Sequence, residues 1–246
     1  MTTLLIDGDI LVYRWAYGAE KAIDWDDGIW TLHADANEAC AMLDDNIAKL
    51  MKMLGAKNVV VALTGKRNFR KELWPGYKAN RTKQRKPLCM PAVREHIAAN
   101  YACLVCDGIE ADDLLGIAGT KPGDRAERII VTEDKDLLQI PGFHYRPSQP
   151  HGGVFAVTRE EGEKLHLAQS IAGDPTDNYP GCPGYGIARA RKMVEAAPKW
   201  ETVRDAYLSA GLTERDALTQ ARLAKILTYD WFNHATRKPI LWTPST

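Results

Sequence analysis

Acidic residues that directly follow short apolar segments constrain this chain more than any other feature. Glu110, Asp112 and Asp113 follow one such segment. Asp134 and Asp136 follow the next one. Aspartate packs poorly in a protein core, and neighbouring carboxylates repel one another unless a positive charge lies between them. The pattern therefore predicts a divalent cation with hard oxygen ligands, Mg²⁺ or Mn²⁺.

Short apolar segments alternate along the chain with stretches that have a helical period of apolar residues. The apolar segments are 3–6, 59–63, 102–105 and 128–131, and the helical stretches are 10–17, 39–54 and 91–100. Strands separated by helices indicate an α/β fold with a parallel sheet, in which sites form beyond the carboxyl ends of the strands. Asp7 follows the first segment, so we expect it beside the acids named above.

Three further stretches have recognisable patterns. The polar and aromatic stretch 24–30 is expected to be a solvated loop, and 151–157 an edge strand of a hairpin, with His151 structural or exposed to solvent. The stretch 213–232 is predicted to be an amphipathic helix. We expect Trp231, Phe232 and Trp242 to be packing residues rather than residues that stack on bases.

Length and composition are those of an ordinary soluble protein. The 246 residues suit one large domain, or a main domain with a small appendage. No apolar run of about 18 residues occurs, so no membrane span is expected, and the first residues lack the pattern of a signal peptide. The five cysteines suggest reduced thiols in a cytosol. Cys103 and Cys106 are interpreted as buried strand residues rather than a metal or redox site.

The formal net charge of zero hides a strongly basic segment. Residues 66–86 contain nine Lys or Arg and one acid, which gives +8 there and −8 for the remainder of the chain. Lysine and arginine neutralise phosphates, and the interleaved Phe69, Trp74 and Tyr77 could stack on unpaired bases. The alternative is a solvated surface segment whose aromatic residues are buried. The candidate DNA-binding residues of this segment are Arg70, Tyr77, Lys78, Arg81 and Lys83.

A glycine- and proline-rich loop, G-D-P-T-D-N-Y-P-G-C-P-G-Y-G, spans residues 173–186 and separates two helical stretches. Such a loop can present backbone N–H groups to a phosphate, with the positive end of the second helix behind them. The candidate contacts are Gly184, Gly186, Arg189 and Lys192, and the loop adds the carboxylates of Asp174 and Asp177. The alternative is an ordinary helical hairpin with a capping aspartate.

Five motifs occur in the order seen in the 5′-nuclease (flap endonuclease-like) superfamily. They are D-G-D, Y-K-A-N-R, E-A-D-D, T-E-D-K-D and the loop 173–186. Over nearly its whole length the chain resembles this superfamily, in particular the short 5′→3′ exonucleases of podovirus phages, and it is similar to the 5′-nuclease domain of bacterial DNA polymerase I. The resemblance implies a PIN-like metal-dependent core over 1–160 with a basic arch at 66–90. It also implies a helical region over 161–246 with a helix–three-turn–helix motif at about 168–195.

The resemblance also implies roles for individual residues. Asp7, Glu110, Asp112 and Asp134 would surround one metal ion, and Asp113, Asp136, Asp174 and Asp177 would serve a second, partly through water. Lys78 and Arg81 would contact the scissile phosphate and, with Asp112 and Asp134, form the catalytic set, while Tyr77 would line the arch. The loop at 181–186 would hold the duplex backbone and, as in relatives, a K⁺ ion.

The function so implied is 5′→3′ exonuclease or structure-specific 5′-nuclease activity on duplex DNA, from 5′ ends, nicks or flaps. Two metal ions would drive hydrolysis, with flap endonuclease and RNase H activity on RNA–DNA hybrids as further options. The setting would be phage DNA replication and recombination in the host cytoplasm, with the enzyme as a monomer and no membrane partner. Two alternatives stay open. A PIN-type ribonuclease would lack the loop 173–186, and a non-catalytic DNA-binding module would tolerate loss of the acids.

One position departs from the superfamily pattern. Many relatives carry an aspartate at the end of the second strand, where this chain has Leu63, Thr64 and Gly65. We expect one metal contact to be missing there, or to be replaced by Thr64 through water. Asp9, where many relatives have a small residue, is the other candidate to compensate.

Overall fold

A mixed sheet of six strands forms the centre of the computed structural model, which describes residues 1–123 and 127–244 and, for Thr82 and Lys83, only the backbone. The strand order is β5-β4-β1-β6-β7-β8. The strands are β1 (Thr3–Asp7), β4 (Asn58–Asn68), β5 (Ala102–Gly108), β6 (Arg128–Val131), β7 (Gly142–Tyr145) and β8 (Phe155–Val157).

The first five of these strands are parallel, which confirms the expected α/β fold. Strand β8 pairs antiparallel with β7 at the edge, and it begins four residues later than the predicted edge strand. Strand β7 escaped prediction because Gly-Phe-His-Tyr lacks an apolar run. The carboxyl ends of β1, β4, β5 and β6 therefore meet at one edge of the sheet, as sites in parallel sheets require.

Helices cover both faces of the sheet, and β1 supplies side chains to both. Leu4 and Ile6 face the core shared with α1 (Gly8–Gly18), α2 (Ala36–Met53) and α4 (Met90–Asn100). Leu5 faces the opposite core, shared with α5 (Ala111–Thr120). This alternation follows from the two-residue period of a strand and explains why a strand buried on both faces reads as a continuous apolar run.

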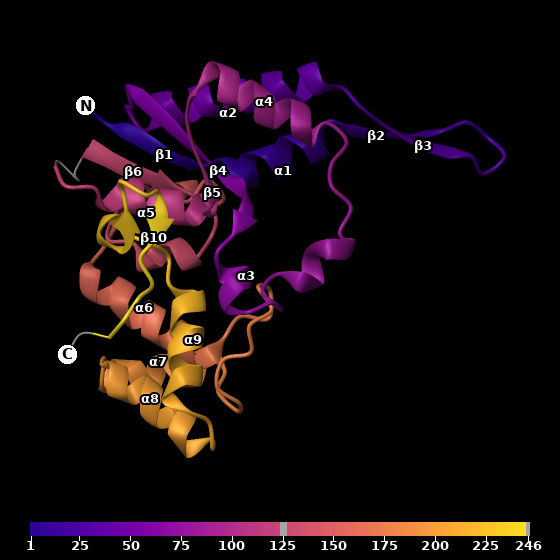
Figure 1. Cartoon of the computed structure of the whole chain (residues 1–246). Helices are drawn as coiled ribbons and strands as arrows, with labels where there is room; N and C mark the ends of the chain where they lie inside the picture. Colours follow the sequence, from indigo (N-terminus) through magenta and orange to yellow (C-terminus); the bar gives the residue numbers. More distant parts are fainter. Residues whose placement is uncertain (124–126, 245–246) are drawn as a thin grey trace.

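The C-terminal part forms a helical layer below the sheet in Figure 1. Its helices are α6 (Arg159–Ala172), α7 (Ile187–Ala196), α8 (Trp200–Ser209) and α9 (Glu214–Ala224). Their shared core includes Leu167, Val194 and Tyr207. No helix in the described ranges is long and apolar enough to cross a membrane.

Helix α9 is shorter than the predicted helix over 213–232. It ends at Ala224 because Lys225 is extended, and the chain continues into η5 (Tyr229–Trp231), β9 (Phe232–Asn233) and β10 (Lys238–Pro239). Trp231 and Phe232 pack against the core around α5, and the Trp242 ring lies 5.4 Å from that of Trp200. The prediction that these aromatic residues serve packing is confirmed.

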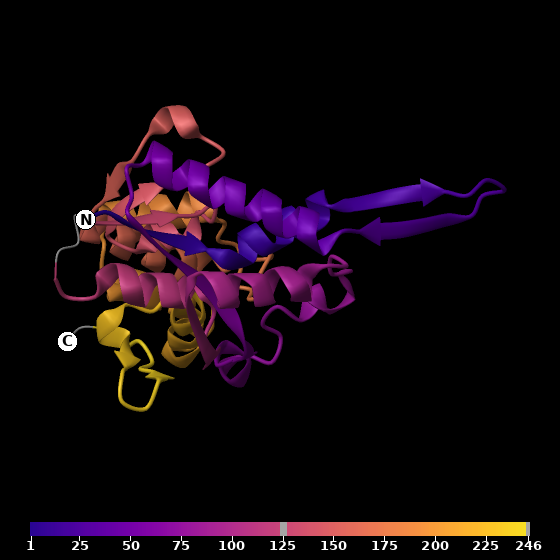
Figure 2. The same ribbon diagram turned by 90° about the horizontal axis from the view of Figure 1, so that it is seen from above.

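The stretch 24–30, predicted to be a loop, is the tip of a β-hairpin. Strands β2 (Glu20–Asp24) and β3 (Trp30–Ala34) pair antiparallel and project away from the body of the molecule (Figure 2). The turn contains three consecutive residues with positive φ, at 26, 27 and 28. Both faces of the hairpin are largely exposed, so its sequence lacks the apolar alternation that announces a half-buried strand.

The basic segment runs from the end of β4 to α4 and contains only short helices. These are α3 (Arg70–Leu73) and η1 (Ala79–Lys83). Two other short helices, η3 (Asp136–Gln139) and η4 (Pro150–Gly152), flank β7. His151 lies exposed in η4.

Candidate active site

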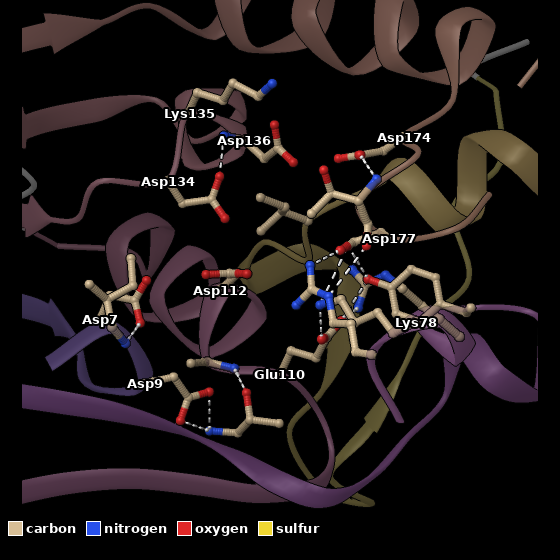
Figure 3. A pocket seen from close by; sticks show the side chains of 18 of the residues that line it. Asp7, Asp9, Lys78, Glu110, Asp112, Asp134, Lys135, Asp136, Asp174 and Asp177 are labelled. Atoms are coloured by element: carbon tan, nitrogen blue, oxygen red, sulfur yellow. Dashed lines mark hydrogen bonds and ion pairs between the residues drawn. The ribbon is translucent and has the colours of Figure 1, made fainter. Parts of the chain in front are cut away.

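A cavity of about 790 Å³ lies at the carboxyl ends of β1, β4 and β6, and acidic side chains line it (Figure 3). Its wall also includes residues of the basic segment and of the loop 173–186. The acids that line it are Asp7, Asp9, Glu110, Asp112, Asp134, Asp136, Asp174 and Asp177. Carboxylates that are far apart in the sequence are thus brought to one place, as their positions after strands predicted.

Local turns fix several of these carboxylates. Asp7 caps the N-terminus of α1, where Oδ1 accepts from the N–H of Ile10 at 3.2 Å, and Oδ2 accepts from the Thr132 hydroxyl at 3.1 Å. Beyond β6, Thr132 Oγ1 accepts from the N–H of Asp134 at 3.0 Å. Asp134 Oδ1 in turn accepts from the N–H of Asp136 at 2.8 Å. Each acid is therefore held by its own backbone turn rather than by a neighbouring cation.

Four carboxylates of the cavity, called here the unpaired acids, are Asp7, Asp112, Asp134 and Asp136. None of them forms an ion pair within residues 1–123 and 127–244. Burial, together with the charges of Asp9 and Asp134, raises the pKa of Asp7 to about 7. Burial and the neighbouring acids likewise raise the pKa of Asp112 well above its ordinary value and that of Asp136 to about 6. This half of the cavity has an uncompensated excess of negative charge.

Three other acids, called here the paired acids, already have a cation: Glu110 and Asp177, which line the cavity, and Asp113, which is buried outside its lining. Glu110 accepts from Arg70 Nη1 at 3.1 Å and forms an ion pair with Lys78. Although burial opposes the shift, these two cations lower the pKa of Glu110 to about 2. Asp177 pairs with Arg81 and, at 3.4 Å, with Lys78. The protein itself neutralises this half.

The structure contradicts two predicted roles, those of Asp113 in metal binding and Arg70 in DNA binding. The two side chains form a fully buried pair, with Arg70 Nη1 and Nη2 at 2.7 and 2.8 Å from the carboxylate of Asp113. The remaining guanidinium donors of Arg70 are also satisfied, by the backbone carbonyls of Leu223 and Lys225 at 2.9 and 2.6 Å. Asp113 is 0% exposed and also accepts from the N–H of Leu227. Asp113 does not line the cavity, and Arg70 lines it with its guanidinium donors already engaged.

The aromatic residues of the basic segment are mostly buried, as the alternative interpretation held. Tyr77 is 3% exposed, its ring lies 6.3 Å from that of Tyr179, and its hydroxyl donates to Glu110 and Asp177. Phe69 is buried too, whereas Trp74 is partly exposed. The prediction that Tyr77 presents a face to DNA is therefore wrong, because its ring packs inside and only its hydroxyl reaches the cavity.

Lys78 and Arg81, the predicted contacts of the scissile phosphate, line the cavity next to Glu110 and Asp177. The predicted DNA contact of Lys83 concerns a side chain outside the described part of the structure. Sequence reasoning missed Tyr13 and Tyr17, which line the cavity from α1 and are about 40% exposed. Their spacing of four residues, which places two aromatic side chains on one helical face, was the available signal.

The loop 173–186 folds back on itself between α6 and α7. A Cβ atom on Gly173 would lie 2.4 Å from the backbone N of Gly181, so the crossing requires glycine. Gly186 begins α7 with no side-chain cap, and Gly184 has open space around it. Arg189 stacks over Tyr185 at 4.2 Å. The N–H groups at the start of α7 are therefore free of side-chain caps, as an anion-binding helix end would be.

The residues of the cavity fit a divalent metal by their chemistry, although they are not closed around one. Across the described residues, no three acidic, histidine or cysteine side chains converge closely enough to hold an ion as they stand. Carboxylates that repel one another spread apart, and a cation would draw them together. Carboxylate oxygens are the hard donors that Mg²⁺ and Mn²⁺ prefer.

Comparison with known proteins agrees with this geometry. Residues 2–149 match the family described as the 5′-3′ exonuclease, N-terminal resolvase-like domain. The chain belongs to the 5′-3′ exonuclease family. This 5′-3′ exonuclease chain is 29% identical over 281 residues to the exodeoxyribonuclease of Enterobacteria phage T3, which covers 98% of the chain and 92% of the relative. It is 30% identical over 237 residues to DNA polymerase I of Thermus aquaticus, covering 92% of the chain and 27% of that polymerase.

A solved structure shares the fold. The flap endonuclease D15 of bacteriophage T5, crystallised as a pseudo-enzyme-product complex with DNA and metal ions, superimposes with a TM-score of 0.70. The match covers 92% of this chain and 89% of D15. Because the sequence identity is 15%, it supports the fold alone. The expected PIN-like α/β core is confirmed, as is the resemblance to phage exonucleases and to DNA polymerase I.

Proposed function

We propose that this 5′-3′ exonuclease is a Mg²⁺- or Mn²⁺-dependent exodeoxyribonuclease that hydrolyses phosphodiester bonds of duplex DNA from 5′ ends, nicks or flaps. One observation carries the proposal: a single cavity holds four unpaired acids and, opposite them, Lys78 and Arg81. The acids suit divalent ions, and the two cations suit the phosphate that those ions would act on. The T3 relative is named an exodeoxyribonuclease, which supports DNA as the substrate.

The four unpaired acids would hold the metal ions together with Asp174 and Asp177. Asp7, Asp112 and Asp134 would take one ion, and Asp136 and Asp174 a second, with Asp177 partly through water. Glu110 could join the first set only if Lys78 leaves it, because Lys78 and Arg70 now occupy both of its oxygens. When bound, such ions supply a water of lowered pKa as nucleophile and positive charge beside the leaving 3′-oxygen.

Lys78 and Arg81 would exchange partners during binding. They now pair with Glu110 and Asp177, and an incoming phosphate would compete for the same ammonium and guanidinium groups. Once on the phosphate, both side chains stabilise the negative charge that grows on its oxygens. Water would replace the 3′-oxygen on phosphorus, so the product would carry a 5′-phosphate, and no side chain of the cavity would form a covalent intermediate.

The helical region would hold the duplex. We assign residues 1–160 to the catalytic core with 66–90 as the arch, and 161–246 to the duplex-binding region, whose motif spans about 168–195. The N–H groups at Gly184 and Gly186, with Arg189, would contact the backbone, and main-chain carbonyls of this loop would bind K⁺. Lys192, which borders a separate cavity of about 550 Å³, would add a further contact with DNA. The protein would act as a monomer in phage DNA replication and recombination. RNA–DNA hybrids would be a further substrate.

Product mapping tests this function. Duplex, flap and nicked DNA labelled at the 5′ end, and a single-stranded RNA, are incubated with the protein in Mg²⁺ or EDTA. We expect short 5′-phosphorylated products from DNA in Mg²⁺ and none in EDTA. Cleavage of the RNA but of none of the DNA substrates would favour the PIN-type ribonuclease. DNA binding without cleavage in Mg²⁺ or Mn²⁺ would favour the non-catalytic module.

A further inference from the structure

Strand β4 contains a different polar arrangement beside Leu63, where the superfamily acid is missing. Its regular register with β5 ends at Thr64, and all three polar groups of Thr64 are hydrogen-bonded. Its N–H donates to Asp9 Oδ2 at 3.2 Å, its carbonyl accepts from Arg94 Nη2 at 2.7 Å, and its hydroxyl accepts from the N–H of Ala111 at 2.9 Å. Asp9 and Arg94 also pair directly, with Nη1 2.8 Å from Oδ1.

These contacts join β4 and α4 to α1 and α5, the two helices that begin beside the proposed ligands Asp7 and Asp112. Asp9 lies in the first turn of α1, two residues after Asp7. Ala111 is the first residue of α5, immediately before Asp112. Arg94, from α4, supplies the positive charge between them and is half-buried. The Thr64 hydroxyl is therefore the link between β4 and the start of α5, and Asp9 is the link back to α1.

A carboxylate cannot simply stand at the next position. A Cβ atom on Gly65 would lie 2.3 Å from the carbonyl oxygen of Cys106 and 2.9 Å from the Cα of Asp107, both backbone atoms. The strands pack too closely there for any side chain. Asp9 is also unsuited to act as a ligand, because Arg94 already neutralises it and Thr64 occupies its oxygens.

We propose that Arg94, Asp9 and Thr64 form a positioning unit that takes the place of the missing acid. It acts by fixing Asp112 at the start of α5 relative to Asp7 at the end of β1, and Asp9 contributes through Thr64 rather than as a metal ligand. The inference rests on the proposed function, since it assumes that Asp7 and Asp112 hold a common ion. The uncharged Thr64 hydroxyl would thus set the affinity of the site by holding the start of α5 in place, rather than by binding the ion itself.

The decisive variant is Thr64→Val, which removes the hydroxyl with little change of shape and no change of charge. We expect calorimetric titration without DNA to show Mg²⁺ affinity weakened by about 5- to 150-fold, the usual span for two coupled sites. The matched control Thr64→Ser keeps the hydroxyl and should bind Mg²⁺ as the wild type does. Wild-type affinity in Thr64→Val would overturn the inference.

A charge-neutral pair of changes separates positioning from direct ligation. The double variant Asp9→Asn/Arg94→Gln leaves the net charge unaltered and should weaken Mg²⁺ binding by a similar factor. Substitutions that disrupt the same unit do not have additive effects. Adding Thr64→Val to the double variant should therefore not weaken Mg²⁺ binding further. If the losses of Mg²⁺ affinity in the double variant and in Thr64→Val added up fully, Asp9 would be a ligand itself and the proposal would be overturned. This pair also serves if Thr64→Val does not fold.

Measurements on the wild-type protein distinguish a failure of the proposed function from a failure of the positioning unit. If it neither binds Mg²⁺ nor cleaves DNA, the proposed function fails and this inference fails with it. If it does both and the Thr64→Val variant matches it in Mg²⁺ affinity, only the positioning unit is wrong. Duplex affinity measured in EDTA should be equal in all variants, because none of the three residues belongs to the proposed duplex contacts.

Discussion

The two halves of one cavity differ in how their negative charge is balanced. Glu110, one of the paired acids, has Arg70 and Lys78 beside it, and its pKa falls to about 2. Asp7, one of the unpaired acids, faces other carboxylates, and its pKa rises to about 7. Both side chains are almost completely buried, so burial does not account for the difference.

The contrast indicates that the paired and the unpaired acids have different roles. Where the protein provides its own cations, the acids either stabilise the fold, as Asp113 does, or hold Lys78 and Arg81 ready for a phosphate. Where the protein provides no cation, a metal ion from solution would neutralise the acids. Substitutions in the two halves should therefore have different consequences, and four predictions follow this contrast from the largest effect to the smallest.

Asp112→Asn in the unpaired half should reduce DNA cleavage by about a thousandfold or more, because metal ions contribute several kcal/mol to such reactions. The fold and the duplex affinity should remain. Steady-state cleavage in Mg²⁺ and binding in EDTA measure the two quantities. Asp107→Asn is the matched control, since Asp107 forms an exposed pair with Arg67 outside the cavity. Equal activity of both variants would remove Asp112 from the site.

Arg70→Met in the paired half should lower the free energy of unfolding by about 3–5 kcal/mol, because it leaves the buried Asp113 without its cation. Urea denaturation measures the change. The control Arg67→Met breaks the exposed pair with Asp107 and should change stability by less than about 1 kcal/mol. Similar small effects in both variants would mean that Arg70 does not hold the fold together.

Lys78→Ala should lower turnover by about 10²- to 10³-fold, the usual effect of removing one donor to a developing charge. Duplex affinity should change much less, because contacts of the loop 173–186 remain. Single-turnover rates and binding curves on the same labelled duplex separate the two quantities. A loss confined to affinity would show that the basic segment only tethers DNA.

The metal-free protein should lose stability as the pH rises from about 4 to about 7. In the folded state Asp7 keeps its proton up to a pKa of about 7, whereas its ordinary value is 3.8, so the unfolded chain loses the proton first. Asp136 acts in the same sense, with a pKa of about 6. Thermal unfolding across this range should show the decline, with Asp7→Asn flatter than wild type. A wild-type stability that rises over this range, or a decline that Asp7→Asn leaves unchanged, would contradict the effect of burial and neighbouring charge on these acids.

The location of the site was predictable from the sequence because strand ends and acids are both local features. Asp7, Asp112 and Asp134 each follow an apolar run, and parallel strands bring such positions together. Which acid has a cation was not predictable. Arg70 and Asp113 are 43 residues apart, and only the packing of α3 beside α5 and α9 makes them partners.

Other misses have equally physical causes. Tyr77 lies among lysines and arginines, and a basic run gives no sign of which aromatic ring turns inward. The hairpin of β2 and β3 has both faces exposed, so no apolar period announced it. The position of Arg94 beside Asp9 depends on α4 packing against α1, which no local pattern records.

Uptake of a divalent ion by the unpaired acids is the claim on which the rest depends. Calorimetric titration of Mg²⁺ into the metal-free protein at about pH 6.5, in two buffers of different protonation enthalpy, tests it directly, since metal binding displaces protons from carboxylates that hold them. We predict binding with proton release, lost in Asp112→Asn and retained in Lys78→Ala. Absence of Mg²⁺ binding, or binding that Asp112→Asn leaves unchanged, would contradict it.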